Sequence, residues 1–335
     1  LPESVTSIGD SAFGGCSGLT SIDLPKNLTT IGSYAFAYSP SLARIDIPAS
    51  VTSIDTDVFD GCYSLTGIHV DANNPNYSSD ERGVLFNKAK TKLIKAPGAL
   101  SGSYTIPDGV TTISNNAFHY CEQLESVSIP EGVKIIDMYT FGECSSLTSV
   151  SIPNTVTTIC YSAFYRCIGL TSISLPDSVT TIEKTAFWDC TNLAFIDLPD
   201  NLTTLQYATF YHCTGLLGIT IPASVRSIET TAFMGCTDLS SIIFEGDAPT
   251  FVQDIFADVT ATAHYPADNA TWTEEVRQNY GGTITWIPYE VLPFTDVPAN
   301  SFYYNPVKWA LEKKITVGVS DTLIGGAEQC NRARL

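Results

Sequence analysis

A phenylalanine recurs every 23 residues along most of this chain. Nine copies share it, and a proline opens each of them. A fixed period of this length is the sequence signature of a solenoid, in which each copy packs only on its neighbours. The repeated phenylalanines are Phe13, Phe36, Phe59, Phe118, Phe141, Phe164, Phe187, Phe210 and Phe233.

One copy, residues 153–175, shows what the unit can form. Leu170, Ile173 and Leu175 have the spacing of a short strand with one buried face, and the proline at 176 ends it because it has no N–H to donate. Val156 and Ile159 form a second apolar pair on a return path, and residues 163–167 fit a single helical or 3₁₀ turn. We therefore expect an α/β, β-rich solenoid whose coils are stable only when stacked.

The pattern L-x-x-I-x-L followed by P-x-x-V-T-x-I-x-x-x-A-F-x-x-C resembles the BspA-like class of leucine-rich repeat, found in bacterial and some protist surface proteins. The resemblance covers residues 1 to about 244. It implies a right-handed solenoid of nine 23-residue repeats, with the L-x-x-I-x-L strands as a parallel sheet on the concave side. It also implies extracellular display and adhesion.

Five segments follow from the repeat pattern. Repeats one to three occupy residues 1–70, a hairpin insertion 71–106, and repeats four to nine 107–244. Residues 245–290 have no evident period and are expected to fold back over the last coil as a cap, because an open coil would expose apolar core. The last segment, 291–335, is a short tail.

The insertion predicts a hairpin, with strands at 83–86 and 92–95. Its basic residues have two interpretations: a positive site for an acidic partner, or, favoured here, lysines that protect a projecting hairpin edge from pairing with other chains. An Asp and Asn cluster before the hairpin has oxygen ligands for Ca²⁺, but it lacks the glycine and terminal glutamate of a calcium loop, which favours ordinary turn chemistry. The basic residues are Arg82, Lys88, Lys90, Lys92 and Lys95.

Eight of the ten cysteines lie three residues after the repeated phenylalanine, and Ser39 fills the same position in the second copy. A position that accepts either Cys or Ser predicts a small buried side chain with a free thiol rather than half of a disulfide. Cys160 and Cys330 lie outside this ladder, and their state stays open. No C-x-x-C pair or histidine cluster is present, so we expect no metal site.

The formal net charge of -18 argues against nucleic acid and anionic membrane surfaces as partners. The sequence contains no run of 18 apolar residues, so no membrane insertion is expected. No metalloprotease, hydrolase, P-loop or dinucleotide motif is present, and the four histidines occupy unrelated repeat positions. We expect no catalytic residue, no cofactor and no enzymatic activity.

Three consecutive copies place a large aromatic residue directly after the phenylalanine: Tyr165, Trp188 and Tyr211. Repetition should align them as a stripe along one edge. One interpretation is a binding surface for a glycan or a protein, because flat aromatic rings with polar neighbours suit both. The other is that the rings merely pack on one another and on the loops. The strand face, small and mostly polar, is the competing place for a ligand.

The tail resembles the start of an S-layer homology (SLH) domain, in the segment F-T-D-V and in a predicted helix bearing V-x-W-A. The match weakens after about 27 residues and the module is incomplete. By position, the resemblance makes Asp296 and Arg332 candidates for binding secondary cell-wall polysaccharide.

Together these features predict a secreted, non-catalytic bacterial cell-surface protein that mediates adhesion or protein–protein recognition, with a host or neighbouring-cell protein or glycan as partner. One alternative is a carbohydrate-binding surface module. A second is a structural spacer of the cell surface or cell wall.

Overall fold

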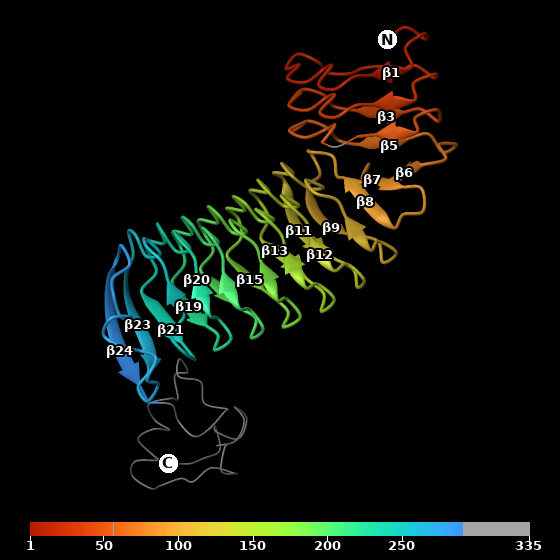
Figure 1. Cartoon of the computed structure of the whole chain (residues 1–335). Helices are drawn as coiled ribbons and strands as arrows, with labels where there is room; N and C mark the ends of the chain where they lie inside the picture. Colours follow the sequence, from red (N-terminus) through yellow and green to blue (C-terminus); the bar gives the residue numbers. More distant parts are fainter. Residues whose placement is uncertain (56, 291–335) are drawn as a thin grey trace.

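The computed structural model describes residues 1–55 and 57–290. The chain forms a β-solenoid of about 12 turns, which confirms the stacked coils expected from the period. Figure 1 shows the first coils, in red and orange, as one stack, and the coils from yellow to blue as a second, curved stack that runs in another direction. The change of direction falls at the insertion, between residues 71 and 106.

The L-x-x-I-x-L segments form parallel strands along one side of the solenoid, as predicted. Ile173 and Leu175 are buried, whereas the alternating residues Ser172 and Ser174 are exposed. Neighbouring strands pair at a register of one repeat, for example Ser172 with Phe195. The strands are β3 (Ile45–Ile47), β5 (Ile68–Val70), β9 (Gly102–Thr105), β11 (Leu124–Ser128), β13 (Ser149–Ser151), β15 (Ser172–Ser174), β17 (Phe195–Asp197), β19 (Gly218–Ile221), β21 (Ser241–Phe244), β23 (Thr260–Pro266) and β24 (Thr283–Tyr289).

The return path of each coil also forms a strand, of only two residues, so each coil carries a parallel ladder on both sides. In all of these pairs except those of β4 and β22 the second residue is buried, as Ile159 is, and in β4 and β22 it is half-buried. These strands are β1 (Ser7–Ile8), β2 (Thr30–Ile31), β4 (Ser53–Ile54), β10 (Thr112–Ile113), β12 (Ile135–Ile136), β14 (Thr158–Ile159), β16 (Thr181–Ile182), β18 (Thr204–Leu205), β20 (Ser227–Ile228) and β22 (Thr250–Phe251).

The helical turn predicted at residues 163–167 is wrong, because this segment consists of two successive β-turns. Ser162 and Arg166 have φ of 52° and 54°, in the left-handed region that no right-handed helix tolerates. The Phe164 N–H donates to the carbonyl of Ala186 in the next coil at 2.9 Å instead of closing a helical turn. Within the described ranges the chain has no helix, so the fold there is β rather than α/β.

The interior is built from two ladders of identical side chains. The phenylalanine rings stack, with a centroid distance of 5.2 Å between Phe164 and Phe187. Six of the eight ladder cysteines donate their S–H to the phenylalanine carbonyl of the preceding copy, as Cys167 does to Phe141 at 3.0 Å, whereas Cys121 donates to the Pro97 carbonyl. The Ser39 hydroxyl makes the same bond at 2.8 Å, which explains why Cys and Ser interchange there. Every cysteine in the described part is a free thiol, as predicted, and Cys160 is half-buried.

The insertion contains a hairpin that does not project. Strands β6 (Tyr77–Ser79), β7 (Leu85–Asn87) and β8 (Lys92–Lys95) are antiparallel, and β8 then pairs in parallel with β10. Strand β7 lies where two hydrophobic cores meet: Leu85 belongs to the N-terminal core, whereas Val84 and Phe86 belong to the other. The edge-protection interpretation is therefore wrong for β8, which is paired on both sides.

The Asp and Asn cluster before the hairpin makes turns. Asn74 accepts the backbone N–H groups of Asn76 and Tyr77 at 2.9 Å, and Asp71 accepts that of Asn73 at 2.8 Å. These bonds are the ordinary turn chemistry favoured by the sequence.

The solenoid continues beyond residue 244, where the sequence period seemed to end. Phe256 lies one repeat after Phe233 and stacks on it at 5.8 Å, and β22 and β24 extend the two ladders. Trp272 then packs on Phe244 at 4.8 Å and buries the last coil under aromatic side chains. Residues 245–290 thus close the array by adding to it rather than only by folding over it.

The SLH-like helix and the residues Asp296, Arg332 and Cys330 lie outside the described residues. Among the residues that are described, no helix is long and apolar enough to cross a membrane.

Candidate functional site

The residue after each repeated phenylalanine is placed at the outer edge of the coil by its two flanking turns. In the coil of Tyr165, the left-handed residues Ser162 and Arg166 turn the backbone so that Phe164 and Cys167 are buried and Tyr165 is half-buried. The next two coils repeat this geometry around Trp188 and Tyr211. The predicted outward position is therefore present in all three.

The three aromatic side chains lie side by side along this edge. The ring centroids of Tyr165 and Trp188 are 6.5 Å apart with planes inclined by 44°. Trp188 and Tyr211 are in closer contact, at 4.1 Å and 30°. The structure thus brings the predicted stripe together, with each ring half exposed.

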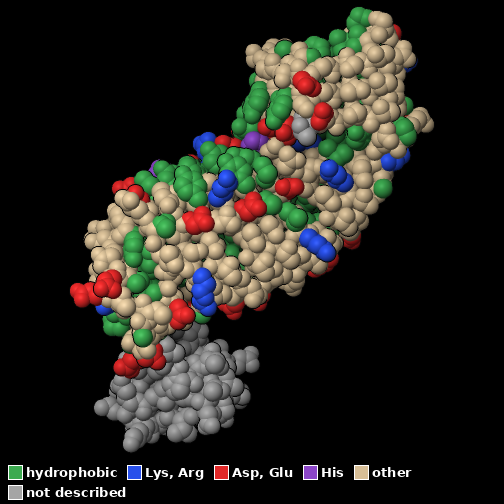
Figure 2. All heavy atoms as spheres, viewed as in Figure 1, with side chains coloured by type: hydrophobic (Ala, Val, Ile, Leu, Met, Phe, Trp, Pro, Cys, Tyr) green, Lys and Arg blue, Asp and Glu red, His purple; other side chains and the backbone are tan. Residues whose placement is uncertain are grey.

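The stripe is one part of a longer aromatic surface that crosses the insertion. Tyr139 contacts Tyr165 at 6.0 Å and His119 at 5.3 Å, and His119 stacks on Tyr120 at 4.0 Å. We call this surface the aromatic belt. Figure 2 shows hydrophobic side chains, with histidines among them, along this edge of the molecule. Its members are Tyr38, Tyr63, His119, Tyr120, Tyr139, Tyr161, Tyr165, Trp188, Tyr211 and His212.

Sequence reasoning missed the N-terminal half of the belt. Its residues stand at other positions of the copy than Tyr165 does: Tyr38 and Tyr120 follow their phenylalanine by two, and Tyr139 precedes its own by two. The insertion also separates Tyr63 from Tyr120 in sequence, whereas their ring centroids are 5.3 Å apart in space. The sequence feature that could have revealed these residues is the high number of tyrosines in the turns, because they do not recur at one repeat position.

Several belt tyrosines occupy backbone conformations that favour glycine. Tyr38, Tyr120 and Tyr139 have φ of 54°, 64° and 49°, and the position of Tyr38 carries glycine in neighbouring copies, at Gly15 and Gly61. A side chain in this region costs roughly 1–2 kcal/mol. Other coils place residues such as Ser162 and Arg166 in the same region at the equivalent positions, so this conformation belongs to the turns of the repeat rather than to the belt.

Charged groups beside the belt are paired. Arg166 Nη1 lies 3.0 Å from Glu143 Oε1, and Asp189 accepts a hydrogen bond from Trp188 Nε1 at 3.2 Å and lies 3.3 Å from His212 Nδ1. Burial raises the pKa of Tyr165, so its phenol stays protonated at neutral pH and is able to donate a hydrogen bond to a ligand. The belt is therefore amphipathic, with apolar faces and a polar margin.

A buried ionic network supports the belt at the insertion. Asp60 is 3% exposed, and its carboxylate lies 3.0 Å from Lys95 Nζ and 3.1 Å from His119 Nδ1. Lys95 also donates to the carbonyls of Asn116 and His119, at 2.8 and 3.3 Å. Burial raises the pKa of Asp60, but the Lys95 charge and the His119 hydrogen bond outweigh it and hold that pKa below its usual value. The network joins the N-terminal coils to the coil that carries His119.

The predicted basic cluster does not form a free positive site. Lys95 is buried in the network described above, the Arg82 guanidinium donates to the carbonyls of Ser101 and Ser103, and Lys88 Nζ donates to the Ala72 carbonyl at 3.0 Å. Arg82 and Lys88 therefore bond within the insertion, and Lys95 joins the insertion to the coils on both sides of it.

The strand face has two hollows, and the one over β3 and β5 measures about 470 Å³ and is lined by Arg44, Asp46 and His69 among others. Phe195, 60% exposed, is the most exposed large apolar side chain of this face among the described residues, and it lies beside a second hollow of about 210 Å³ that also involves Gly218 and Ile243. Among the described residues, no group of His, Cys, Asp or Glu is arranged to hold a metal ion.

Comparison with known proteins assigns the repeats. The model of the BspA type leucine rich repeat region matches residues 1–97, 99–216 and 134–263. The chain belongs to the BspA-type leucine-rich repeat family. A comparison with curated proteins finds no match. None of these comparisons supports the SLH resemblance of the tail.

Two solved structures share the fold. The pneumococcal vaccine antigen PcpA is 23% identical, with a TM-score of 0.59, over 84% of this chain and 71% of its own. A leucine-rich repeat protein from Eubacterium ventriosum is 26% identical, with a TM-score of 0.52, over 69% of this chain and 80% of its own.

Proposed function

We propose that this BspA-type solenoid is a non-catalytic recognition protein of the bacterial surface that binds a protein ligand through its aromatic belt. The observation that carries the proposal is the continuity of the belt. It runs from Tyr38 to His212 without a break at the insertion, although the sequence register is lost there.

The composition of the belt fits a protein interface. Tyrosine, tryptophan and arginine are the residues most enriched in interface hot spots, because large rigid rings bury area at low entropic cost. Tyr165, Trp188 and Tyr211 supply such rings, and the Arg166–Glu143 pair lies at their margin. Their half-burial means that the coils already fix the rings before a partner arrives, which lowers the entropic cost of binding.

A glycan ligand is the second candidate. Stacking on a sugar requires an open ring face, and Trp188 has one face against Tyr211 at 4.1 Å. This packing favours a protein partner, and the glycan becomes an outcome of the test below. The structural-spacer alternative predicts no saturable ligand.

Display at the cell surface rests on the family resemblance alone. Attachment to the wall through Asp296 and Arg332 stays a prediction from the SLH resemblance. It is tested by sedimentation of the chain with purified cell-wall polysaccharide, in comparison with an Asp296→Ala, Arg332→Ala double variant.

The experiment for the main proposal is a binding screen of the full chain against extracellular-matrix proteins and a glycan array. The belt variant carries Tyr165→Ser, Trp188→Ser and Tyr211→Ser. Tyr207→Ser is the matched control, because Tyr207 is 44% exposed in the same coil as Tyr211 but, in the described part of the chain, has no ring contact with a belt member.

The proposal predicts saturable binding to a protein that the belt variant loses and Tyr207→Ser retains. Because the belt rings also pack on one another, thermal melting of each variant is measured, and Tyr165→Ser alone is used if the triple variant melts early. If the ligand found is a glycan and the belt variant loses it, the partner is a glycan rather than a protein. If every variant binds as wild type does, the belt is not the binding surface.

A further inference from the structure

An exposed aromatic side chain interrupts the mostly polar strand face. Phe195 stands in β17 at the position where the preceding copy carries Ser172. In the next coil this position is Gly218, whose Cβ would meet only atoms of Ser241, at 3.4 and 3.8 Å. Because Gly218 has no side chain, a hollow of about 210 Å³ opens beside Phe195, and Ile243 lines it from the coil beyond.

Three polar side chains in or beside this hollow have no hydrogen-bond partner in the described part of the chain. The Asp197 carboxylate, which lines the hollow, is exposed and makes no ion pair there either. The other two are the exposed hydroxyls of Ser172 and Ser174 in the preceding coil. An occupant of the hollow therefore meets an exposed ring, a carboxylate that accepts hydrogen bonds, and hydroxyls that donate and accept them.

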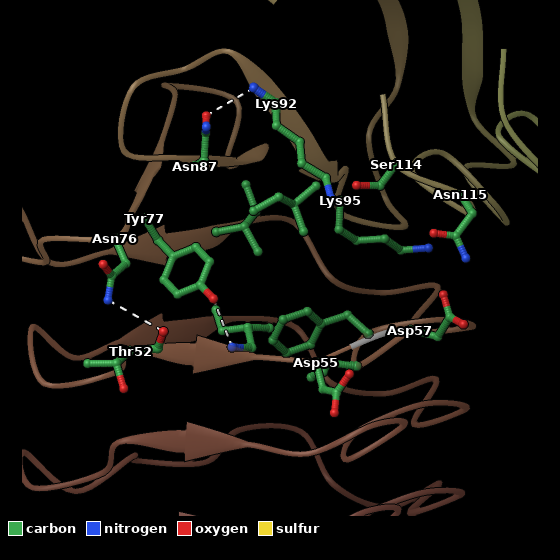
Figure 3. Close-up of a pocket in the computed structure, with 15 residues that line it drawn as sticks. Thr52, Asp55, Asp57, Asn76, Tyr77, Asn87, Lys92, Lys95, Ser114 and Asn115 are labelled. Atoms are coloured by element: carbon green, nitrogen blue, oxygen red, sulfur yellow. Dashed lines mark hydrogen bonds between the residues drawn. The ribbon is translucent and has the colours of Figure 1, made fainter. Parts of the chain in front are cut away.

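The two larger hollows differ, because the protein already uses their polar groups. Figure 3 shows Tyr77 and Asp57 among the residues that line the pocket beside the insertion. The Tyr77 hydroxyl accepts a backbone N–H of the third coil at 2.9 Å, and Asp57 accepts a hydrogen bond from Asn116 at 2.8 Å. In the hollow over β3 and β5, Arg44 and Asp46 pair with each other at 2.7 Å. These bonds belong to the packing of the coils themselves.

The size and charge of the hollow at Phe195 restrict its occupant. Its volume lies below the range of about 300–1,000 Å³ that is typical for drug-sized ligands, so it takes a single ring-sized group. The strands from β11 to β21 carry no lysine or arginine. An anionic ligand would therefore find no cationic partner on these strands and would be repelled by Asp197.

A neutral sugar ring matches these groups better than an apolar side chain does. An apolar side chain would cover Asp197 without giving it a hydrogen bond, which costs free energy. A pyranose ring carries hydroxyls that donate to a carboxylate and a C–H face that packs on an aromatic ring.

We propose that the hollow holds one pyranose ring of a neutral glycan, with a C–H face of the sugar against Phe195. Asp197 accepts hydrogen bonds from sugar hydroxyls, and its charge strengthens them. This glycan site is separate from the aromatic belt, because Phe195 has no ring contact with a belt member among residues 1–55 and 57–290. It does not depend on the belt proposal.

The test is a ligand-observed NMR titration of the full chain with cellotetraose, maltotetraose and tetra-N-acetylchitotetraose, and with tetragalacturonate as the anionic comparator. Phe195→Ser introduces the residue of the preceding copy. Gly218→Val fills the hollow, and its Cβ has room because the nearest atom lies at 3.4 Å. Ile135→Ser is the matched control, because it also replaces an exposed apolar side chain, on the return-path strand β12.

We expect a neutral glycan to bind saturably, with a Kd of about 1 mM or tighter. Phe195→Ser and Gly218→Val should each weaken binding at least about fivefold, whereas Ile135→Ser and the belt variant Trp188→Ala should stay within about twofold of wild type. Asp197→Ser should narrow the preference for the neutral glycan over tetragalacturonate. Thermal melting checks that the variants fold, and Gly218→Ser replaces Gly218→Val if the latter does not.

Three results would overturn the glycan site. The first is the absence of saturable binding by every neutral glycan up to about 10 mM. The second is equal binding by Phe195→Ser and wild type, and if Trp188→Ala loses the glycan at the same time, the glycan binds to the belt. The third is tighter binding of tetragalacturonate than of the neutral glycans, which rejects the neutral ligand.

Discussion

Replacement of Lys95 by methionine should uncouple the N-terminal coils from the rest of the solenoid. Methionine keeps most of the side-chain volume but removes the ammonium that contacts Asp60 at 3.0 Å and the Asn116 carbonyl at 2.8 Å. Asp60, 3% exposed, then keeps the contact of its carboxylate with His119 Nδ1 at 3.1 Å. Breaking a buried ion pair in this way costs about 3–5 kcal/mol, and His119 places the expected loss near the lower end.

The loss should be local, because residues 8–68 and Leu85 form one hydrophobic core and the later coils form another. Hydrogen exchange measured by mass spectrometry reports the opening of residues 1–70 separately from that of residues 107–290. In Lys95→Met the first segment should exchange faster by the factor that corresponds to about 3 kcal/mol, roughly 150-fold, while the second changes little. Lys92→Met, on the same strand but exposed, is the control and should change stability by less than about 0.5 kcal/mol.

Acid provides a second readout of the same network. The folded-state pKa of Asp60 lies below its usual value of 3.8, so its stabilisation is complete above that pH and is lost as pH falls through the folded pKa. In Lys95→Met, burial should raise that pKa, so mild acidification should narrow the difference between variant and wild type. A difference that widens below pH 5, or a Lys95→Met exchange pattern equal to that of Lys92→Met, would refute the reasoning.

Three further outcomes test the repeat architecture. Cys167→Ser should cost less than about 1 kcal/mol because the hydroxyl is able to donate to the Phe141 carbonyl, whereas Cys167→Ala should cost about 1–3 kcal/mol, both measured by urea unfolding. Thr231→Gly should increase the free energy of unfolding by about 1 kcal/mol and so raise the melting temperature, because a β-branched residue at φ of 58° is strained. A lower melting temperature of this variant would contradict the expectation. Gly235→Ala should destabilise, because its Cβ would collide with the His212 ring. Unfolding curves of these single variants give each value directly.

Thiol chemistry gives an independent check on the cysteine ladder. Burial raises the pKa of Cys62 to about 11 and of Cys236 to about 12, so these thiols should not react with Ellman's reagent at pH 8 until the chain unfolds. Rapid reaction of a buried ladder cysteine, such as Cys62 or Cys236, in the folded protein would contradict the packing.

The sequence was sufficient to predict the solenoid, its strand face and its free thiols, because the same pattern of apolar residues, proline and phenylalanine occurs in nine copies. It failed where repetition is weak. The turn at residues 163–167 is compact in any conformation, and only the left-handed φ of Ser162 and Arg166 distinguishes it from a helix. In the extra coil, Phe256 follows Phe233 by 23 residues and stacks on it, but the residues around Phe256 do not match the repeat pattern.

The candidate sites divide in the same way. Tyr165, Trp188 and Tyr211 could be aligned from their common position, and the structure brings them together. The contact of Tyr63 with Tyr120 and the ion pair of Lys95 with Asp60 join residues on either side of the insertion. Such contacts depend on how the insertion folds back, and no periodicity in one sequence records that.

The most direct test of the recognition proposal is the affinity of the ligand found in the screen for Trp188→Ala and for Tyr207→Ala. Trp188 contacts both Tyr165 and Tyr211 and so lies within the belt, whereas Tyr207 is exposed and makes no ring contact with a belt member among the described residues. The account predicts that Trp188→Ala weakens binding by about 2 kcal/mol or more, roughly 30-fold, and that Tyr207→Ala stays within about twofold of wild type. Equal affinities for the two variants, with unchanged melting temperatures, would contradict the assignment of the belt as the recognition surface.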